Sequence, residues 1–215
     1  MSISKAWYWE IAEDQIWDYS SEDVYYYVER WKEKKYRNVL DLGCGIGRNT
    51  LLLAKNGFDI SGIDLSEFGV NKTKERLLKN GLDGNVICGD IHNLPYGDNS
   101  FDALLAYHVI SHTDSIGIRK IIGEMNRVVR NKGELYFTLC SKESPTYKNK
   151  KYKKVDRNTV LKNEGPEQNI PHFYSNEEEV KEILNGMKIL IIRHIKDIFS
   201  NTYSWHYFIL CENNK

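Results

Sequence analysis

An acidic residue and three glycines at alternate positions form the most informative stretch of the sequence. The run is Val39-Leu40-Asp41-Leu42-Gly43-Cys44-Gly45-Ile46-Gly47, in which apolar residues lead directly into the glycines. Glycine has no Cβ and readily takes positive φ, so the chain can turn sharply at the end of a strand while its backbone approaches a ligand closely. The pattern therefore indicates a turn that binds a nucleoside.

Two acids further along the chain are placed to hold such a nucleoside. Asp64 follows the first glycine by about twenty residues, at the end of the apolar run Phe58–Ile63. A carboxylate there can accept hydrogen bonds from both ribose hydroxyls, and such charge-assisted bonds are about twice as strong as neutral ones. Asp90 follows the run Asn85–Cys88 and is placed to accept from an adenine amino group. Dinucleotide-binding folds also use a ribose acid, but their glycines follow Gly-x-Gly-x-x-Gly rather than Gly-x-Gly-x-Gly.

These acids and glycines lie at the ends of predicted strands that alternate with predicted helices. Short apolar runs predict strands at Asn38–Leu42, Phe58–Ile63, Asn85–Cys88, Phe101–Tyr107 and Glu134–Cys140. Helices are predicted near Asn49–Lys55, Glu67–Asn80 and Ile116–Arg130. Right-handed crossovers then predict a doubly wound α/β sheet, with its ligand outside the carboxyl ends of the strands.

The last part of the chain has a different pattern. Ser175-Asn176-Glu177-Glu178 has the form of a capping box that opens a helix to about Leu184. Two apolar runs follow, Met187–Ile195 and Tyr203–Cys211, with no helix between them. We therefore expect an antiparallel hairpin, whereas a nicotinamide dehydrogenase more often continues with another helix and a parallel strand.

The glycine turn, Asp64 and the triplet Gly89-Asp90-Ile91 together resemble the signature of class I S-adenosylmethionine-dependent methyltransferases. The resemblance runs from about Val39 to Cys140. One departure is Asn131-Lys132-Gly133, where this family usually has Pro-Gly-Gly, and it removes rigidity rather than a chemical group. The alternative is a flavodoxin-like or dehydrogenase domain whose acids match by coincidence.

The resemblance implies a mostly parallel seven-stranded sheet of order 3-2-1-4-5-7-6, with helices on both faces and an antiparallel C-terminal hairpin. It also implies S-adenosylmethionine as cofactor and S-adenosylhomocysteine as product. The cofactor-binding residues that it implies are Asp41, Gly43, Cys44, Gly45, Gly47, Asn49, Asp64, Leu65, Asp90, Ile91 and Tyr107. Among them, Asp41 is expected to fix the turn or to reach the methionine amino group through water.

Two histidines after the fourth predicted strand are the candidate catalytic residues, His108 and His112. In the resembled family this place lies between cofactor and acceptor. A base is needed only if the acceptor arrives protonated, since the sulfonium is already activated and alignment alone can supply about 7–11 kcal/mol. The alternative is a structural role, because His112 precedes Thr113-Asp114-Ser115, a predicted helix cap.

Residues 1–36 are rich in aromatic side chains, including four of the five tryptophans. In the resembled family this region commonly covers the cofactor as a lid, and aromatic faces there would attract a cation by about 0.5–2 kcal/mol per contact. Trp17 and Tyr19 are our candidates for cofactor contact. Plain packing is the alternative that we favour for most of the others, because Tyr27 and Trp31 have the spacing of one helix face.

Residues 141–173 form an insertion that we expect to select the acceptor. It contains the basic run Lys148–Lys154 with interleaved tyrosines, which could grip phosphates and stack bases or could be a solvated surface. His172 follows, as a residue that lines the acceptor pocket or only anchors the loop. The tetrapeptide Ala106-Tyr107-His108-Val109 does not match the Asn-Pro-Pro-Tyr motif of base-amino methylation, which disfavours a nucleic-acid substrate.

Composition agrees with one domain over residues 1–215. The chain has 30 basic and 30 acidic residues, so no overall field attracts nucleic acid or an anionic membrane. Four scattered cysteines favour reduced, buried thiols over a metal or disulfides, and no run reaches the ~18 apolar residues of a spanning helix. We expect a cytoplasmic protein with no resident metal.

Three function classes remain open. The first is a small-molecule methyltransferase, since the insertion is just large enough to roof a compact pocket. The second is an RNA or DNA methyltransferase that uses Lys148–Lys154. The third is a protein that binds the cofactor without transferase activity. Oligomeric state is open in all three.

Overall fold

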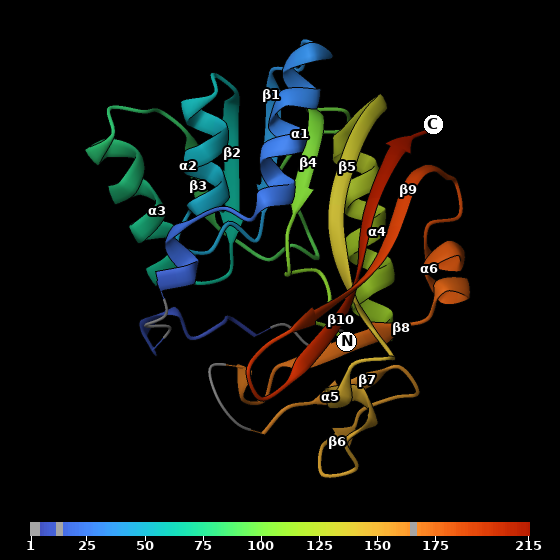
Figure 1. Ribbon diagram of the computed structural model, residues 1–215. Helices are drawn as coiled ribbons and strands as arrows, with labels where there is room; N and C mark the ends of the chain where they lie inside the picture. Colours follow the sequence, from blue (N-terminus) through green and yellow to red (C-terminus); the bar gives the residue numbers. More distant parts are fainter. Residues whose placement is uncertain (1–4, 12–14, 164–166) are drawn as a thin grey trace.

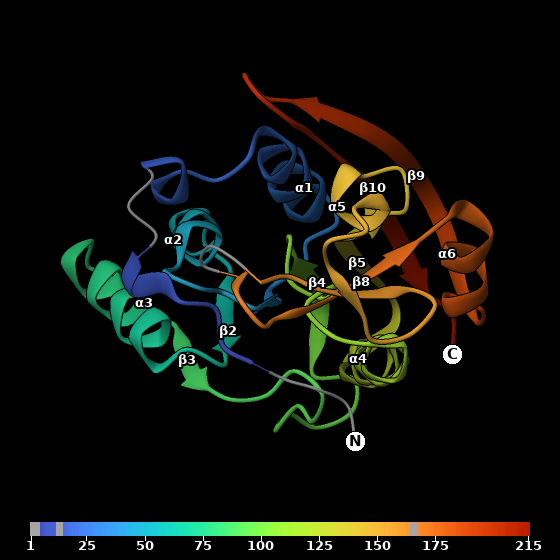
Figure 2. The ribbon, with the colours of Figure 1, turned by 90° about the horizontal axis from the view of Figure 1, so that it is seen from below.

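The computed structural model describes residues 5–11, 15–163 and 167–215. Its centre is a mostly parallel sheet with a layer of helices on each face, as Figures 1 and 2 show. Seven strands build this sheet, in the order β3 (Asn85–Cys88), β2 (Asp59–Asp64), β1 (Asn38–Leu42), β4 (Phe101–Ala106), β5 (Val129–Ser141), β10 (Tyr203–Asn213) and β9 (Met187–Ile198). The predicted order and the antiparallel hairpin are thus confirmed.

The helices divide between the two faces of the sheet. On one face lie α1 (Glu22–Glu33), α2 (Arg48–Lys55) and α3 (Glu67–Lys79), and on the other lie α4 (Ser115–Val128) and α6 (Glu177–Ile183). Two short 3-10 helices, Trp9–Ile11 and Gln15–Asp18, precede α1. Each face buries its own hydrophobic core, so the central strands are apolar on both sides, as parallel strands between helices require.

Helix α1 is attached to the sheet by stacking and by a buried carboxylate. The ring of Tyr27 stacks on that of Tyr136 with 3.6 Å between centroids. Buried Glu134 on β5 accepts hydrogen bonds from Arg30 (2.6 Å) and from the indole Nε1 of Trp31 (3.1 Å). Tyr27 and Trp31 therefore cover the sheet, as their helical spacing predicts.

The insertion adds three strands that the sequence analysis did not predict, so the sheet has ten strands instead of seven. After the short helix α5 (Pro145–Lys148) come β6 (Lys153–Lys154), β7 (Thr159–Leu161) and β8 (Pro171–Ser175), which pair antiparallel. Strand β8 also extends the end of β5 in parallel, through Cys140 and Ser141. Strands of two to five residues are too short to show the alternation of apolar and polar residues by which a strand is recognised in a sequence.

Several predicted boundaries shift by a few residues. The capping box lies one position later than predicted: the side chain of Asn176 accepts from the N–H of Glu179, whose carboxylate accepts from the N–H of Asn176. Ser175 instead ends β8. Strand β5 begins at Val129 rather than Glu134, because the chain passes from α4 directly into extended backbone. The predicted cap of α4 is confirmed, since Asp114 accepts from the N–H of Gly117 at 2.8 Å.

The four cysteines are all free thiols, although they are not all buried as predicted. Cys44 and Cys211 are buried and Cys140 is half-buried, but Cys88 is exposed because β3 is the edge strand of the sheet. Within the described residues, no helix combines the length and the apolar character that crossing a membrane demands.

Candidate active site

One large cavity lies at the carboxyl ends of the central strands. Its volume is about 990 Å³. The described residues before α1, 5–11 and 15–21, here called the N-terminal segment, and the insertion both lie at this edge of the sheet, which is the lower edge in Figure 1. The carboxyl end of β2 contributes Asp64 to its lining, the loops after β1, β3 and β4 contribute Gly43, Asp90 and His112, and the insertion contributes Glu167. This is where an open α/β sheet binds its ligand.

The glycine turn has no room for side chains. Gly43, Gly45 and Gly47 have φ values of 72°, 53° and 86°, in the left-handed region. A Cβ on Gly43 would lie 2.2 Å from Val109, and one on Gly45 would lie 2.3 Å from the ring of Trp9. Both the conformation and the contacts therefore require glycine.

Asp64 is positioned by two backbone N–H groups. Its Oδ2 accepts from Gly45 and its Oδ1 accepts from Ser66, each at 2.8 Å. Burial raises the pKa of Asp64, and these two bonds lower it in part. A carboxylate offers about four lone pairs, so each oxygen retains acceptor capacity toward the cavity that Asp64 lines. These remaining acceptor positions fit the two hydroxyls of a ribose.

Asp41 has a different environment from Asp64. It is buried, and its Oδ2 accepts from the hydroxyl of Thr50 at 2.6 Å. Burial raises the pKa of Asp41 to about 6. Within the described part of the chain, Asp41 is not among the residues that line the cavity. The arrangement matches the first of the two roles expected for Asp41, that of tying the turn to α2.

Asp90 is oriented by a histidine that the sequence analysis missed. Its Oδ1 accepts from the backbone N–H of His92 at 2.9 Å and lies 2.7 Å from Nδ1 of the same ring. The other ring nitrogen of His92 lies 2.9 Å from the hydroxyl of Thr113. A single histidine two residues after an acid carries no spacing signal, so only the fold shows this bridge. Asp90 and Ile91 both line the cavity.

Besides His172 and His206, three residues that line the cavity hold buried polar atoms with no hydrogen-bond partner in the described structure. These atoms are Nε1 of Trp7, Nε1 of Trp9 and Oδ1 of Asn49. Two are donors and one is an acceptor, and a buried polar atom left unpaired costs about 1–3 kcal/mol. A polar ligand with both donors and acceptors would satisfy them, which fits an amino-acid-bearing nucleoside.

Trp17 and Tyr19, the two predicted contacts of the N-terminal segment, line the cavity. The ring of Trp17 packs beside those of Trp7 and Trp9, and the guanidinium of Arg48 lies 5.1 Å from its centroid. The side chain of Tyr19 is 73% exposed, so it lies at the mouth of the cavity. Trp7 and Trp9 also line the cavity and are half-buried as Trp17 is, although they were not among the predicted contacts.

His108 follows β4 in the left-handed region, with φ of 56°. Its backbone N–H donates to the hydroxyl of Thr138 at 2.8 Å, and its ring lies 4.5 Å from that of His206. Burial, and next the charge of His206, hold the pKa of His108 well below its ordinary value. His108 is therefore neutral at pH 7 and a weak base.

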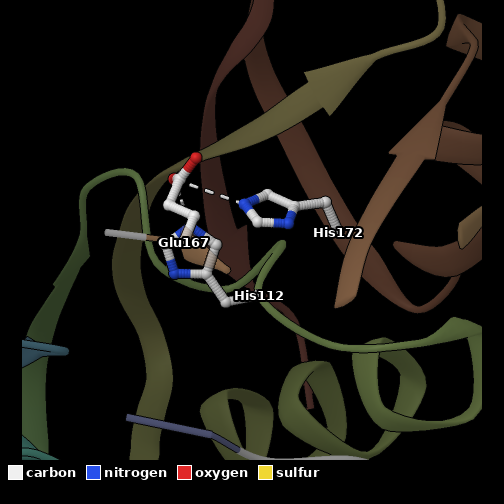
Figure 3. A group of neighbouring side chains, drawn as sticks. All are labelled: His112, Glu167 and His172. Atoms are coloured by element: carbon white, nitrogen blue, oxygen red, sulfur yellow. Dashed lines mark ion pairs between the residues drawn. The ribbon is translucent and has the colours of Figure 1, made fainter. Parts of the chain in front are cut away.

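His112 lies against two residues of the insertion, as Figure 3 shows. Its Nε2 is 3.5 Å from Oε1 of Glu167, and Nε2 of His172 is 3.3 Å from the same oxygen. Strand β8 brings these groups together, because the N–H of Phe173 donates to the carbonyl of Ser111 at 2.8 Å. Glu167 was not predicted as a site residue.

Glu167 and the groups around it shift one another's pKa values. Burial raises the pKa of Glu167, but His112, His172 and Lys162 together hold it well below its usual range. Burial lowers the pKa of His172 to about 4, although Glu167 acts in the opposite direction. Lys162 contacts the second oxygen of Glu167. At neutral pH this end of the cavity therefore holds a carboxylate, a lysine cation and neutral His172.

Comparison with known proteins identifies the family. Residues 39–133 match the family model described as a methyltransferase domain. Residues 39–133 belong to the methyltransferase domain family, and the fold is that of class I S-adenosylmethionine-dependent methyltransferases. The cofactor of this family is S-adenosylmethionine, and the glycine turn and Asp64 fit it.

Relatives of this methyltransferase domain cover only part of its length. Ajmaline N-methyltransferase of Rauvolfia serpentina is 41% identical over 100 residues, which is 45% of this chain and 33% of that enzyme. The chain spans about half the length, or less, of the first curated relatives it matches.

Solved structures share the fold over nearly the whole chain. An S-adenosylmethionine-dependent methyltransferase of Methanosarcina mazei has a TM-score of 0.69 at 20% identity, covering 82% of this chain and 92% of that one. The 1,6-didemethyltoxoflavin-N1-methyltransferase of Burkholderia thailandensis, solved with S-adenosylhomocysteine, has a TM-score of 0.70 at 14% identity and covers 96% and 84%. At these identities the likeness establishes the fold.

Proposed function

We propose that this protein transfers a methyl group from S-adenosylmethionine to a small-molecule acceptor. The observation that carries the proposal is the cavity of about 990 Å³, which is lined by Asp64 and by the group that His112 forms with the insertion residues Glu167 and His172. A cavity of this size holds a nucleoside cofactor and one compact second molecule. Relatives named for N- and C-methylation of ajmaline and of 24-methylenesterol support a small acceptor.

The cofactor supplies a methyl group already activated by the positive sulfur. The protein therefore mainly has to align the acceptor with that methyl group and to exclude water from the site. We propose that Asp64 binds the ribose hydroxyls through its free lone pairs, while the turn Gly43–Gly47 lets the backbone approach. Asp90, whose carboxylate is oriented by His92, accepts a hydrogen bond from the adenine amino group. Trp17 and Tyr19 cover the nucleoside from the N-terminal segment and reduce its contact with water.

The acceptor end of the cavity is where we place His112. It follows β4 and adjoins two insertion residues, so it can orient the acceptor or receive its proton. His108 is the second candidate, but its depressed pKa makes it the weaker base. The insertion, whose residues 164–166 lie outside the described residues, then selects the acceptor by the shape of the roof.

A nucleic-acid substrate is less well supported. In the basic run, Lys148 pairs with Glu143 at 2.7 Å, and Lys154 lies 4.1 Å from the ring centroid of Tyr147. These contacts engage part of the run within the insertion itself. A protein that binds the cofactor without transferring its methyl group is the remaining alternative. The four free thiols fit a reducing compartment, so we place the activity in the cytoplasm.

Calorimetry and a methyl-transfer assay test the proposal together. S-adenosylhomocysteine should bind to the wild-type chain, and Asp64→Asn should weaken that binding by about 10- to 100-fold, because a bond to a charged acceptor is worth about 1.5–3 kcal/mol. With labelled S-adenosylmethionine and a panel of small N, O, S and C acceptors, His112→Ala should lose turnover and keep cofactor binding.

Two results would reject parts of the proposal. Failure of the wild-type chain to bind S-adenosylhomocysteine would reject the cofactor assignment. Near-normal turnover in both His112→Ala and His108→Ala would reject a role for either histidine. Methylation of RNA in preference to every small acceptor, with a steep loss on raising the salt concentration, would favour the nucleic-acid alternative.

A further inference from the structure

We propose that His112, Glu167 and His172 bind a divalent transition-metal ion, best Zn²⁺, at the acceptor end of the cavity. Two imidazole nitrogens and one carboxylate are a ligand set for zinc and similar borderline ions, with a further position left for water or substrate. All three residues line the cavity, and their side chains lie next to one another in Figure 3. The three ligand atoms lie within 4.8 Å of one another.

The spacing of the ligand atoms fits one shared ion. Bonds of about 2.0–2.2 Å in a tetrahedral arrangement place neighbouring ligand atoms about 3.4 Å apart. Glu167 Oε1 lies 3.5 Å from His112 Nε2 and 3.3 Å from His172 Nε2. The carboxylate oxygen is therefore already at ligand separation from both rings, and the two ring nitrogens, which lie within 4.8 Å of each other, would have to approach to about 3.4 Å.

The hydrogen bonding of His172 shows which of its nitrogens is free to bind an ion. Its Nδ1 lies 2.9 Å from the carbonyl oxygen of Ile170, and a carbonyl only accepts, so Nδ1 carries the proton. In the neutral ring, Nε2 then has a lone pair. A backbone carbonyl on the other nitrogen is the partner that commonly orients a metal-bound histidine.

The free nitrogen of His172 faces a carboxylate in a buried place. The His172 side chain is 2% exposed, and its Nε2 has no hydrogen-bond partner in the described residues. A lone pair that faces Glu167 at 3.3 Å is unfavourable unless a cation lies between them. A proton on Nε2 would be the other solution, but the geometry there is not that of a hydrogen bond.

Lys162 shares Glu167 with the proposed ion instead of displacing it. Its Nζ contacts Oε2, whereas both histidines face Oε1. The carboxylate can thus hold a lysine on one oxygen and a metal ion on the other. A metal ion beside Lys162 makes this end of the cavity positive. A positive site favours a substrate whose methyl-accepting atom is anionic or can be deprotonated.

The catalytic consequence rests on the proposed methyl transfer, whereas ion binding itself does not. A metal ion with an open coordination position would bind the nucleophilic atom of the methyl acceptor and lower the pKa of that atom. Its proton would then leave to solvent before the methyl group is transferred. His112 would then act as a ligand and not as a base. Glu167 and His172 would matter for turnover as much as His112 does.

Binding of Zn²⁺ to tag-free, chelator-treated protein tests the site without cofactor or acceptor. Calorimetry should show one Zn²⁺ per chain, and Co²⁺ should give the intense visible bands of a tetrahedral site. Mg²⁺ should not compete, because it prefers oxygen ligands. Glu167→Gln and His172→Gln should each weaken Zn²⁺ binding by more than about tenfold. Losing a residue that only hydrogen-bonds to a metal ligand already costs about tenfold in affinity, and these variants lose a ligand itself.

Matched variants separate this site from adventitious binding. His194→Gln removes an exposed histidine of β9 that is bonded to Ser141 at 2.8 Å, and Glu182→Gln removes an exposed carboxylate paired with Arg119. Both should bind Zn²⁺ as wild type does. Equal losses in these controls, or no stoichiometric binding by wild type, would overturn the proposal. Circular dichroism and S-adenosylhomocysteine binding verify that each variant is folded.

A chelator then tests the catalytic consequence separately. Turnover with the identified acceptor should fall on treatment with EDTA and return with Zn²⁺, while S-adenosylhomocysteine binding stays unchanged. Unaffected turnover in EDTA would overturn the catalytic part and leave the ion site standing. Absence of any methyl transfer, with Zn²⁺ still bound through Glu167 and His172, would reject the proposed function and not the metal site.

Discussion

The indole of Trp9 lies against Gly45 so closely that a Cβ on this glycine would be 2.3 Å from Cζ2 of the ring. The N-terminal segment is thereby attached to the glycine turn. Arg76 reinforces the attachment, since it donates to the carbonyl oxygens of Ile46 (3.1 Å) and Asp18 (3.0 Å). Gly45 thus serves both the turn and the segment that covers it.

Gly45→Ala should lower the free energy of unfolding by about 2–3 kcal/mol, through backbone strain and the clash with Trp9. Gly57→Ala is the matched control, because Gly57 also has positive φ but has nothing within 4 Å of an added Cβ. It should cost only about 1 kcal/mol. Urea unfolding measures both. Adding Trp9→Ala to Gly45→Ala tests the clash, and an equal cost for the two glycine variants would contradict it.

Glu134→Gln should destabilise the protein by about 3 kcal/mol. Breaking a buried ion pair usually lowers the free energy of unfolding by about 3–5 kcal/mol. The smaller value applies here, because Arg30 and Lys34 are partly exposed and can be hydrated when the carboxylate is lost. Urea unfolding at pH 7 measures the loss. Glu29→Gln, which removes an exposed pair with Lys32, should change stability by less than about 1 kcal/mol.

The same carboxylate predicts a dependence on pH. Burial raises the pKa of Glu134, but its bonds to Arg30 and Lys34 lower it overall below the ordinary 4.5. The stabilisation is therefore fully present above pH 4.5 and is lost as the pH falls through the lower folded value. The advantage of wild type over Glu134→Gln should shrink on acidification, and a constant advantage down to the acid transition would contradict this assignment.

Asp41 predicts the opposite pH dependence. Burial raises its pKa from 3.8 to about 6, so the folded state holds this proton more tightly than the unfolded state. That contribution is complete below pH 3.8 and is lost as the pH rises through about 6. As the pH rises between these values, the free energy of unfolding of Asp41→Asn should increase by about 3 kcal/mol relative to that of wild type. Urea unfolding from pH 4 to 8 measures the gain, and exposed Asp59→Asn controls for loss of a carboxylate.

Tryptophan fluorescence should report cofactor binding. Trp7, Trp9 and Trp17 line the cavity, so S-adenosylhomocysteine should change their emission. Trp17→Phe should remove part of that change. Trp205→Phe should keep it, because Trp205 packs on His194 in the hairpin at 4.5 Å. Binding detected by calorimetry with no fluorescence change would place the cofactor away from the N-terminal segment.

The cofactor end of the site follows from the sequence because its determinants are local. Glycines at alternate positions after a strand, an acid at the end of the next strand and a capped helix each depend on neighbours in the chain. Alternating apolar runs and helices then predict a doubly wound sheet through right-handed crossovers, and the order of its strands follows from the resemblance to the methyltransferase family. Asp64 and Gly45 are therefore recognised without coordinates, and their hydrogen bond at 2.8 Å adds the geometry.

Only the tertiary structure brings His112, Glu167 and His172 together. The sequence separates His112 from the other two by the whole of α4, β5 and most of the insertion. Their meeting depends on the pairing of β8 with the end of β5 and on the bond from Phe173 to Ser111. Such long-range pairing is selected by the packing of the whole core, and no short stretch of sequence encodes it. The sequence by itself therefore determined the cofactor and the fold, whereas the chemistry of the acceptor end was decided by how the insertion closes over the sheet.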